Sequence, residues 1–552
     1  MAQYADVVFY LHAHLPYLLG HGTWPHGSVW LYEAAAGVYL PLLRRLRELA
    51  GREVSLRVSL GFTPTLVEQL ADPRFEGGFR EYLRGHAAAA ADDARGFEAE
   101  GEPHLAGLAR GLEAELRGHL EDFDHLDGDL LRGYRELAEV GFLEFAAGAA
   151  THGYLPLLGR EDAVARQVRL GLLAHGRHLG GWTGGFWLPE SAYRPGREWR
   201  RPYTADPLSP RESIGAHLDA AGVRFTFVDA HLVEARVPED TPGDPALLAD
   251  YRDSRRQFRT PYPDRSPYGV YAPDGSAFRV FVRDSSANRQ VWDGFVGYPG
   301  DVLYREFHRR RWPSGLRYWR VTGKDVYVGH KAPYDPEAAR ARVREHAGHF
   351  VGVLEDLAAK APGERAVLTL PFDCELFGHW WYEGPEWLAQ VLEGVVRSER
   401  LTLASPSEVL GRFPAEPVVL REGSWGYDGY HKVWLGDHAR DYWDAVYSAE
   451  DRLADTVRKH GDERRELARR LLAAAARELL LLEASDWPFL IYSHSARDYA
   501  HLRYNQHREC FHALITALER LDAGGVPPEA EELLAQREAN APFGWATWEE
   551  LR

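Results

Sequence analysis

Residues 6–17 read DVVFYLHAHLPY, an apolar run that ends in the pair His12 and His14. Such a run predicts a buried β-strand, Asp6–Leu11, with both histidines at its carboxyl end. Six more runs of this kind follow, and stretches with helical periodicity, such as Tyr32–Leu49 and Pro336–Ala359, lie between most of them. The six further predicted strands are Val54–Leu60, Val140–Ala147, Gly185–Leu188, Arg224–Val228, Phe278–Val282 and Ala366–Leu370. The alternation predicts an α/β fold with a parallel sheet, and the number of repeats indicates a barrel.

The spacing of the predicted strands is uneven, which indicates insertions. Residues 72–139 have a helical pattern and are too long for a simple connection, so we expect a helical insertion there. Residues 194–220 and 234–271 are rich in Pro, Asp, Arg and Tyr, and predict long loops or small subdomains. We place a catalytic barrel in residues 1–405 and a helical C-terminal domain in residues 406–552, where the apolar pattern is strong in Glu466–Leu482.

The composition excludes several classes of partner. The chain has 552 residues and a formal charge of −17, so nucleic acid and anionic membrane surfaces are unfavourable partners. Two cysteines, Cys374 and Cys510, cannot form a disulfide framework, and no long apolar stretch or basic leader is present, so we expect a soluble cytoplasmic protein. Aromatic residues reach 12%, and many stand beside Gly, Pro, His or Asp, a combination that suits sugar rings.

Candidate catalytic groups gather at the predicted carboxyl ends of the strands, which share one face of a parallel barrel. Glu190 and Asp373 follow two different strands and lie among His and Trp residues. Two carboxylates that face one substrate bond can act as nucleophile and general acid/base, the usual chemistry of glycosidic bond cleavage. In isolation Glu190 could be a salt-bridged loop residue and Asp373 a helix N-cap, but their common face favours the catalytic interpretation.

The histidines of this face leave more than one interpretation open. The pair His12 and His14, together with His152, His231 and Asp373, has the composition of a divalent metal site in a barrel hydrolase. The same imidazoles could instead hydrogen-bond the hydroxyls of a sugar, or serve the structure alone. The spacing of these residues does not decide among the three.

Longer motifs connect the chain to a known family. Five segments resemble the signature regions of glycoside hydrolase family 57, and the motifs are most similar to those of its α-glucan branching members. These segments are His12–Tyr17, Thr151–Tyr154, Gly185–Glu190, Leu370–Trp381 and Leu481–Pro488. The resemblance covers nearly the whole chain. It implies an incomplete (β/α)7 barrel with helical insertions, followed by a helical domain that completes the active-site cleft, and a reaction without metal or cofactor.

The resemblance also implies roles for individual residues. Glu190 matches the nucleophile and Asp373 the general acid/base of a retaining double displacement. The implied reaction cleaves an α-1,4 bond of a donor glucan and transfers the chain to the 6-hydroxyl of an acceptor glucan, which creates an α-1,6 branch. The residues that match glucan-binding positions are His12, His14, Trp24, His152, Trp292, Trp425, Trp434 and Asp486. His231 receives no firm role.

The segment 234–271 departs from the family pattern. In the family a loop at this position carries a tyrosine that favours transfer over hydrolysis, and here Tyr251, Tyr262 and Tyr268 are candidates, of which we favour Tyr251. Because this loop is not recognisable, an α-glucan hydrolase or a 4-α-glucanotransferase remains the alternative function. An idle glucan-binding protein or a metal hydrolase is disfavoured, the former because both carboxylates are present.

Overall fold

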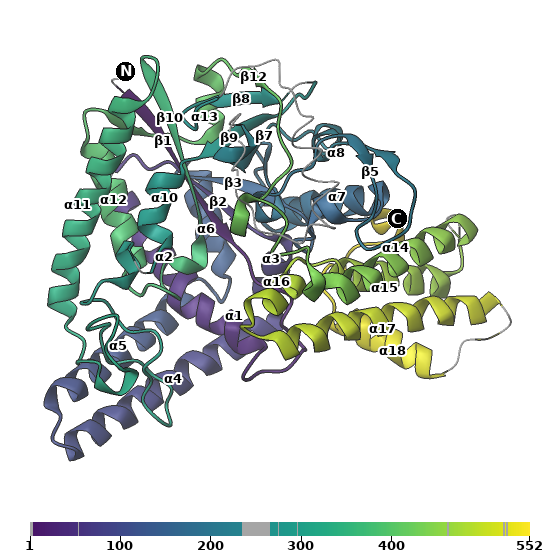
Figure 1. Ribbon diagram of the computed structural model, residues 1–552. Coiled ribbons are helices and arrows are strands. Elements are labelled where there is room, and N and C mark those ends of the chain that lie inside the picture. Colours follow the sequence, from purple (N-terminus) through teal and green to yellow (C-terminus); the bar gives the residue numbers. More distant parts are fainter. Residues whose placement is uncertain are drawn as a thin grey trace.

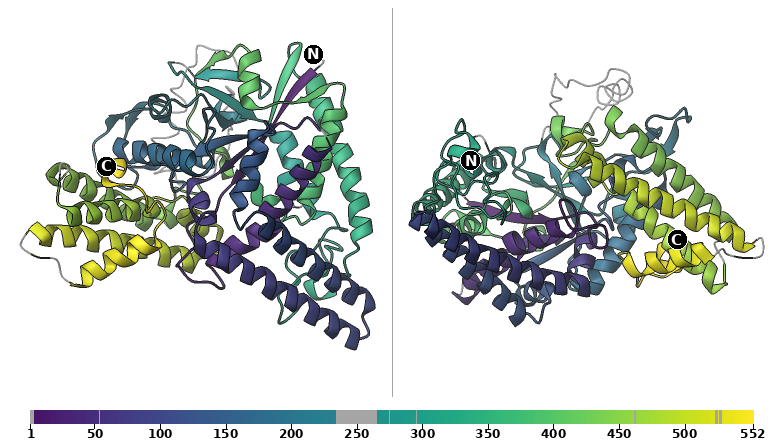
Figure 2. Two further views of the ribbon diagram at one scale, coloured as in Figure 1. Left: turned by 180° about the vertical axis from the view of Figure 1, so that it is seen from behind. Right: turned by 90° about the horizontal axis from the view of Figure 1, so that it is seen from below.

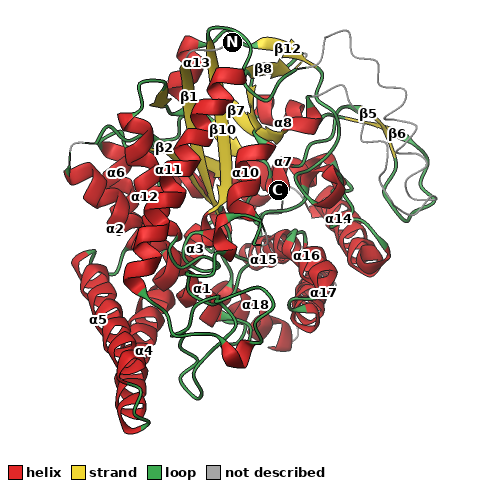
Figure 3. Cartoon of the chain, turned by 60° about the vertical axis from the view of Figure 1, so that its left-hand side comes forward, coloured by secondary structure: helices red, strands yellow, loops and turns green. Residues whose placement is uncertain are grey.

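A closed barrel of parallel strands forms the centre of the molecule. The computed structural model describes residues 4–52, 54–233, 265–273, 275–294, 296–460, 463–522, 525 and 528–552. Within these residues seven parallel strands pair in the order β10-β1-β2-β3-β4-β7-β9, and a pair between Thr369 and Arg283 closes the ring (Figure 3). Their bounds are β1 Tyr4–Ala13, β2 Val58–Phe62, β3 Leu143–Gly148, β4 Gly185–Trp187, β7 Phe225–Asp229, β9 Arg279–Arg283 and β10 Arg365–Asp373. The predicted barrel of seven strands is confirmed.

The inside of the barrel changes from apolar to polar along the strands. The buried cluster inside it includes Val8, Tyr10, Phe225, Phe227, Phe281 and Val367. Side chains two residues apart on a strand point to the same face. Continuing this period to the carboxyl ends places His12, Asp229, Arg283 and Asp373 on the inner face at the mouth of the barrel. The same alternation that fills the core therefore delivers ionisable groups to one open end.

Helices surround the barrel and connect its strands (Figure 1). The first connection is one continuous helical stretch made of α1 (Ser28–Ala34), the π-helix η1 (Ala35–Tyr39) and α2 (Leu40–Gly51). The other helices of the connections are α3 Pro64–Leu70, α7 Glu161–His178, α8 Ile214–Ala220, α10 Ser285–Trp292, α11 Pro336–Lys360, α12 Gly384–Arg397 and α13 Pro406–Arg412. Short 3-10 helices are η2 Leu155–Leu157, η3 Pro189–Ser191, η4 Ala230–Leu232, η5 Tyr298–Gly300, η6 Val328–His330, η7 Cys374–Leu376, η8 Tyr427–Gly429 and η9 Asp437–Ala439.

The stretch 72–139 contains three helices, α4 Pro73–Ala99, α5 Pro103–His125 and α6 Leu130–Glu139. The side chain of Asp72 accepts a hydrogen bond from the backbone N–H of Arg74 and caps α4. Helices α4 and α5 pack against each other as a pair that projects from the barrel at the lower left of Figure 1. Phe79 of α4 meets Phe123 of α5 edge to face at 4.9 Å, so the pair has an aromatic seam of its own.

Short strands extend the structure beyond the barrel. In the stretch 194–220, β5 (Arg197–Trp199) and β6 (Ser209–Arg211) form an antiparallel hairpin before α8. Strand β8 (Val270–Pro273) pairs with β9, β11 (Leu401–Leu403) pairs with β1, and β12 (Glu416–Val418) pairs with β8. The sheet thus continues past residue 405, and the division of the chain at that residue stays a prediction.

The last part of the chain is helical and packs onto the barrel. Its helices are α14 Arg440–His460, α15 Glu466–Leu482, α16 Asp486–Ser493, α17 Arg497–Asp522, α18 Pro528–Asn540 and α19 Trp548–Leu551. They gather on one side of the barrel, as the views of Figure 2 show. One hydrophobic cluster joins Leu11 and Phe62 of the strands to Leu479 of α15 and Phe511 of α17, so both parts share a core. Among the helices of the described segments, none is both long and apolar enough to cross a membrane.

Candidate active site

Glu190 lies on a strained turn directly after β4. Glu190 and Ser191 both have left-handed backbone conformations, with φ of 60° and 48°. For residues other than glycine such conformations cost roughly 1–3 kcal/mol each and are concentrated at functional sites. The turn directs the carboxylate toward later parts of the chain: Trp425 Nε1 donates to Oε2 at 2.9 Å and Ser485 Oγ donates to Oε1 at 3.3 Å. These two donors fix the orientation of the carboxylate.

Burial makes Glu190 a weaker acid than an exposed glutamate. It raises the pKa of Glu190 to about 7, although the hydrogen bond from Trp425 and the charge of His14 act in the opposite direction. The carboxylate of Asp486 adds to the increase. A half-buried carboxylate held by two donors suits a nucleophile once it is ionised.

Asp373 ends β10 and pairs in register with His12 of β1. Its side chain does not cap the following helix η7, so the N-cap interpretation is wrong. Burial raises the pKa of Asp373 well above its usual range, and the nearby charges of Glu375 and Glu190 raise it further against the effect of Arg283. The charge of Glu190 thus favours a proton on Asp373, and in this state Glu190 can attack while Asp373 donates a proton.

The three predicted histidines form one stacked group. Their rings lie 4.0 Å apart for His14 and His152 and 5.0 Å apart for His12 and His152. His14 Nε2 is hydrogen-bonded to Asp486 Oδ1 at 3.0 Å and His14 Nδ1 to Thr63 Oγ1 at 3.0 Å. His152 Nε2 is hydrogen-bonded to His12 at 3.1 Å, and His152 Nδ1 to Ser485 Oγ at 2.8 Å. Ser485 therefore links His152 to Glu190.

The charge of the group is concentrated on one ring. Burial opposes protonation of His14, but Asp486, Glu190 and Glu375 together raise its pKa. Burial lowers the pKa of His12 and His152 well below the usual range, and the charge on His14 adds to this effect. The arrangement favours a proton on His14, which pairs with a carboxylate, and disfavours a positive charge on the other two rings.

The donor set does not have the arrangement of a metal site. Both ring nitrogens of His14 and of His152 already have protein partners, so their lone pairs do not converge on one point. In the described segments, groups with metal-ligand spacing lie elsewhere: Glu161, Glu212 and His217, and His460, Glu463 and Asp522.

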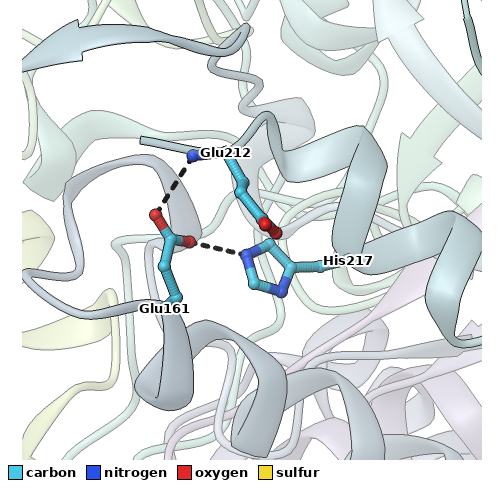
Figure 4. Close-up of side chains that lie close together, drawn as sticks. All are labelled: Glu161, Glu212 and His217. Carbon is cyan, nitrogen blue, oxygen red and sulfur yellow. Dashed lines mark hydrogen bonds and ion pairs between the residues drawn. The ribbon is translucent and has the colours of Figure 1, made fainter. Parts of the chain in front are cut away.

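The first of these groups forms an ion-pair network (Figure 4). Glu161 Oε2 pairs with His217 Nε2 at 2.7 Å, and its other oxygen accepts from the backbone of Glu212 and from Arg211. Against the effect of burial, His217 and Arg211 lower the pKa of Glu161 to about 2. These contacts join α7 to the β5–β6 hairpin and to α8.

The predicted aromatic residues have different environments. The indole of Trp425 contacts Trp187 at 4.9 Å and Trp292 at 5.9 Å, both edge to face, beside Glu190. Trp24 is 81% exposed, in the loop between β1 and α1. Trp434 is only 1% exposed and stacks on Tyr154 at 4.7 Å, so in this structure its ring supports the site from within the core and offers no open face to a glucan.

The remaining predicted residues have less direct placements. His231 Nε2 is hydrogen-bonded to the carbonyl oxygen of Gly429 at 2.6 Å and ties the end of β7 to the stretch that carries Trp425. Tyr251 and Tyr262 lie outside the described residues, and Tyr268 is half-buried against the core. The choice of Tyr251 stays a prediction.

Sequence reasoning missed a third carboxylate. Glu375 Oε1 accepts from the backbone N–H of His14 at 3.0 Å and from the hydroxyl of Tyr39 at 2.5 Å. Burial raises the pKa of Glu375 to about 7. Tyr39 ends the π-helix η1, an irregularity that is frequent at functional sites. The signal in the sequence was the position of Glu375, two residues after Asp373 in the same motif.

Comparisons with known proteins agree with this geometry. Residues 8–421 match the family model described as glycosyl hydrolase family 57, and residues 445–545 match the C-terminal region of 1,4-alpha-glucan branching enzymes. A 1,4-alpha-glucan branching enzyme of Thermococcus kodakarensis is 36% identical over 522 residues, which span 93% of this chain and 74% of that protein.

Two solved structures extend the likeness to three dimensions. The GH57-type branching enzyme from Pyrococcus horikoshii matches with a TM-score of 0.87 and 36% identity, over 98% of this chain and 94% of that one. The alpha-amylase AmyC from Thermotoga maritima matches with a TM-score of 0.80 and 26% identity, over 99% of each chain. The family match includes both carboxylates and all of the barrel except the first residues of β1, and the chain belongs to glycosyl hydrolase family 57.

Proposed function

We propose that the chain is a 1,4-α-glucan branching enzyme that works by a retaining double displacement. The observation that carries this proposal is the contact of the C-terminal region with Glu190 and His14. Ser485 and Asp486 lie within the match to branching enzymes, and they bind Glu190 and His14 of the barrel. The part of the chain most similar to branching enzymes thus contributes side chains to the site.

In the first step Glu190 attacks the anomeric carbon of an α-1,4-linked glucose. The bond from that carbon to the glycosidic oxygen breaks, and Asp373 gives its proton to this oxygen as the chain leaves. The hydrogen bonds from Trp425 and Ser485 hold the attacking carboxylate in place. The histidine group offers ring N–H donors for the hydroxyls of the bound sugar.

In the second step the 6-hydroxyl of an acceptor glucan replaces the leaving chain. Asp373, now ionised, takes the proton of this hydroxyl as its oxygen attacks the anomeric carbon and the bond to Glu190 breaks. Two inversions restore the α configuration and leave an α-1,6 branch. We assign the donor and acceptor as linear α-1,4-glucans, in a glycogen-type synthesis, and a cytoplasmic location remains part of the proposal.

Product analysis on amylose tests the reaction. We expect new α-1,6 linkages, measured from the chains released by a debranching enzyme, to exceed the new reducing ends by a wide margin. Reducing ends without branches would identify a hydrolase instead. The alternative has specific support, because the amylase AmyC matches over 99% of both chains. Redistributed chain lengths with neither product would identify a 4-α-glucanotransferase.

A plot of the rate against pH should have an acidic limb, where the rate rises, and an alkaline limb, where it falls, and a different carboxyl group should determine each. The reaction needs Glu190 ionised and Asp373 protonated. Burial raises the pKa of both, so activity should rise as Glu190 loses its proton near pH 7 and fall at higher pH as Asp373 ionises. The substitution Glu375→Gln removes a negative charge that raises the pKa of Asp373, so the alkaline limb should move down by about one pH unit.

A matched control separates this effect from a general disturbance of the loop. Glu383 also lies in the loop after β10 and also accepts a hydrogen bond from a tyrosine, Tyr334, but its charge is not among those that raise the pKa of Asp373. Glu383→Gln should therefore leave the alkaline limb in place. A profile of kcat/KM against pH for the three proteins checks both expectations, and an unmoved limb in Glu375→Gln would remove this role from Glu375.

Chelation should not affect the rate, because the histidines are bound to protein partners. After extensive dialysis against a chelator, we expect unchanged branching activity and no stoichiometric transition metal by elemental analysis. Restored metal in excess should add nothing. Loss of activity on dialysis, with recovery on addition of zinc, would instead support the metal interpretation of His12, His14 and His152.

A further inference from the structure

The loop after β10 carries a surface tryptophan that the reaction above does not use. Trp380 follows Asp373 by seven residues and is 57% exposed, whereas its neighbour Trp381 is 1% exposed. Two backbone hydrogen bonds hold this loop. The N–H of Gly378 donates to the carbonyl oxygen of Trp381 at 2.8 Å, and the N–H of Trp380 donates to the carbonyl oxygen of Glu375 at 3.4 Å. The exposure of Trp380 therefore belongs to a well-anchored turn.

Gly378 shows how tightly this turn is packed. Its φ is 123°, and a Cβ at this position would lie 1.8 Å from the carbonyl oxygen of Gly37 in η1. Only glycine fits both the backbone conformation and this close approach. The turn is thus docked on the same π-helix that ends in Tyr39, the partner of Glu375. The turn that carries Trp380 is thus tied to Glu375 and to the π-helix beside it.

Neighbouring side chains fix the orientation of the indole. Trp380 packs on Phe307 with ring centroids 4.7 Å apart and an interplanar angle of 31°. The guanidinium of Arg317 lies 4.2 Å from the centroid of the Phe307 ring, and His379 meets the indole edge to face at 5.0 Å. Burial, with the charges of Arg317 and Arg310, lowers the pKa of His379 to about 4, so this ring is neutral at neutral pH. We call Trp380, Phe307, His379 and Arg317 the Trp380 platform.

The chemistry of the Trp380 platform suits a sugar. An oriented aromatic face with much of its area exposed can stack on the C–H face of a pyranose, and covering it removes apolar surface from water. The adjacent guanidinium and imidazole supply hydrogen-bond donors for hydroxyl groups. Preorganised aromatic side chains of this kind lose little conformational entropy on binding.

The position of the Trp380 platform indicates which part of the glucan it binds. A general acid must reach the glycosidic oxygen, and that oxygen belongs to the chain that leaves. Trp380 is on the loop that extends β10 beyond Asp373, whereas Trp425, Ser485 and Asp486 approach the site from the later part of the chain, beside Glu190. The leaving chain and the acceptor that replaces it occupy the same side of the cleavage point.

We propose that the Trp380 platform is a glucan subsite on the acid/base side, which stacks a glucose of the departing chain and then one of the acceptor chain. This inference rests on the proposed function for its substrate, an α-1,4-glucan. It predicts a role in binding rather than in the chemical step, because Trp380 is not among the groups that contact Glu190.

Calorimetric titration of maltoheptaose, a linear α-1,4-glucan, tests the proposal in the full-length Glu190→Gln protein, which binds without turnover. Adding Trp380→Ala should raise Kd about 3- to 10-fold, the loss expected for one aromatic stacking contact. Trp380→Phe keeps an aromatic face and should bind nearly as the parent does. Trp380→Leu keeps apolar volume without that face and should behave like the alanine variant.

A surface tryptophan outside the site provides the matched control. Trp312 is 87% exposed, and the ion pair of Arg311 with Glu100 places it near the turn between α4 and α5. Trp312→Ala should leave Kd unchanged. An unchanged Kd in Trp380→Ala, a parent-like Kd in Trp380→Leu, or an equal loss in Trp312→Ala would each overturn the subsite.

The two proposals can fail separately. The titration measures glucan binding without any reaction, so it tests the Trp380 platform by itself. If the wild-type enzyme makes no α-1,6 linkages from amylose, that result overturns only the proposed branching activity. In the active enzyme Trp380→Ala should raise KM for amylose several-fold with little change in kcat. Melting temperatures of all variants show whether each has kept its fold, and Trp380→Leu, which retains apolar volume, keeps the test decisive if the alanine variant does not fold.

Discussion

The Glu190→Gln variant should lose glucan transfer almost completely, by about 10⁴-fold or more, while its fold persists. Glutamine preserves the size of the side chain but cannot form the covalent glycosyl intermediate. Its amide oxygen can still accept the hydrogen bond from Trp425, and its amide NH2 can donate to the hydroxyl oxygen of Ser485. Initial rates of reducing-end formation and of α-1,6 branch formation should fall together, because both follow the same intermediate.

A smaller variant with an added nucleophile identifies the role of Glu190 more directly. In Glu190→Ala, azide can enter the space of the missing carboxylate and attack the anomeric carbon from that side. With an α-configured donor, one inversion gives a β-glycosyl azide. Glu375→Gln is the matched control, since it removes a buried carboxylate of the same site and should show no azide product. Substantial transfer by Glu190→Gln without azide would exclude Glu190 as the nucleophile.

The barrel was predictable because its strands are local in the sequence. Each is a short apolar run with a polar end, and period-two alternation places those ends at one mouth. The strands that were missed, such as β6 and β12, lack this signal because they contain proline and are short and largely exposed. Their pairing depends on contacts with distant segments, which the local pattern does not contain.

The site was predictable in its carboxylates but not in its contacts. Residues Trp425 and Ser485 reach Glu190 across sequence separations of 235 and 295 residues. The backbone pairing of Gly423 with Tyr193 brings Trp425 to Glu190, and the docking of the C-terminal helices brings Ser485. The resemblance indicated that Trp434 binds glucan, yet its ring is packed against Tyr154. Glu375 lay inside a recognised motif but received no role, because its partner Tyr39 belongs to a different element.

The Asp373→Ala variant should be the second most damaged, with transfer from amylose reduced by about 10²- to 10⁴-fold. Loss of the proton donor makes the glucan oxygen a poor leaving group, and loss of the base also slows the second step. The defect should therefore depend on the donor. With α-maltosyl fluoride the bond from carbon to fluorine breaks and fluoride leaves as the anion, so no proton is needed. Fluoride release should then begin at nearly the wild-type rate.

The rate at which the covalent glycosyl intermediate breaks down shows whether Asp373 is the acid/base or a residue that only supports the fold. Without Asp373 no base activates the acceptor, so about one fluoride per active site should appear as a burst before turnover slows. Azide needs no base, so it should restore turnover. Because azide attacks the intermediate that Glu190 has already formed, the product should be the α-glycosyl azide, whereas Glu190→Ala should give the β-glycosyl azide.

Asp229→Ala is the control, since this buried aspartate ends β7 beside Arg283 at the same mouth. Slow fluoride release without a burst, or a β product from the Asp373 variant, would contradict the assignment. Both carboxyl groups are half-buried at one barrel mouth, and the stereochemistry of two azide products is the observation that distinguishes their roles.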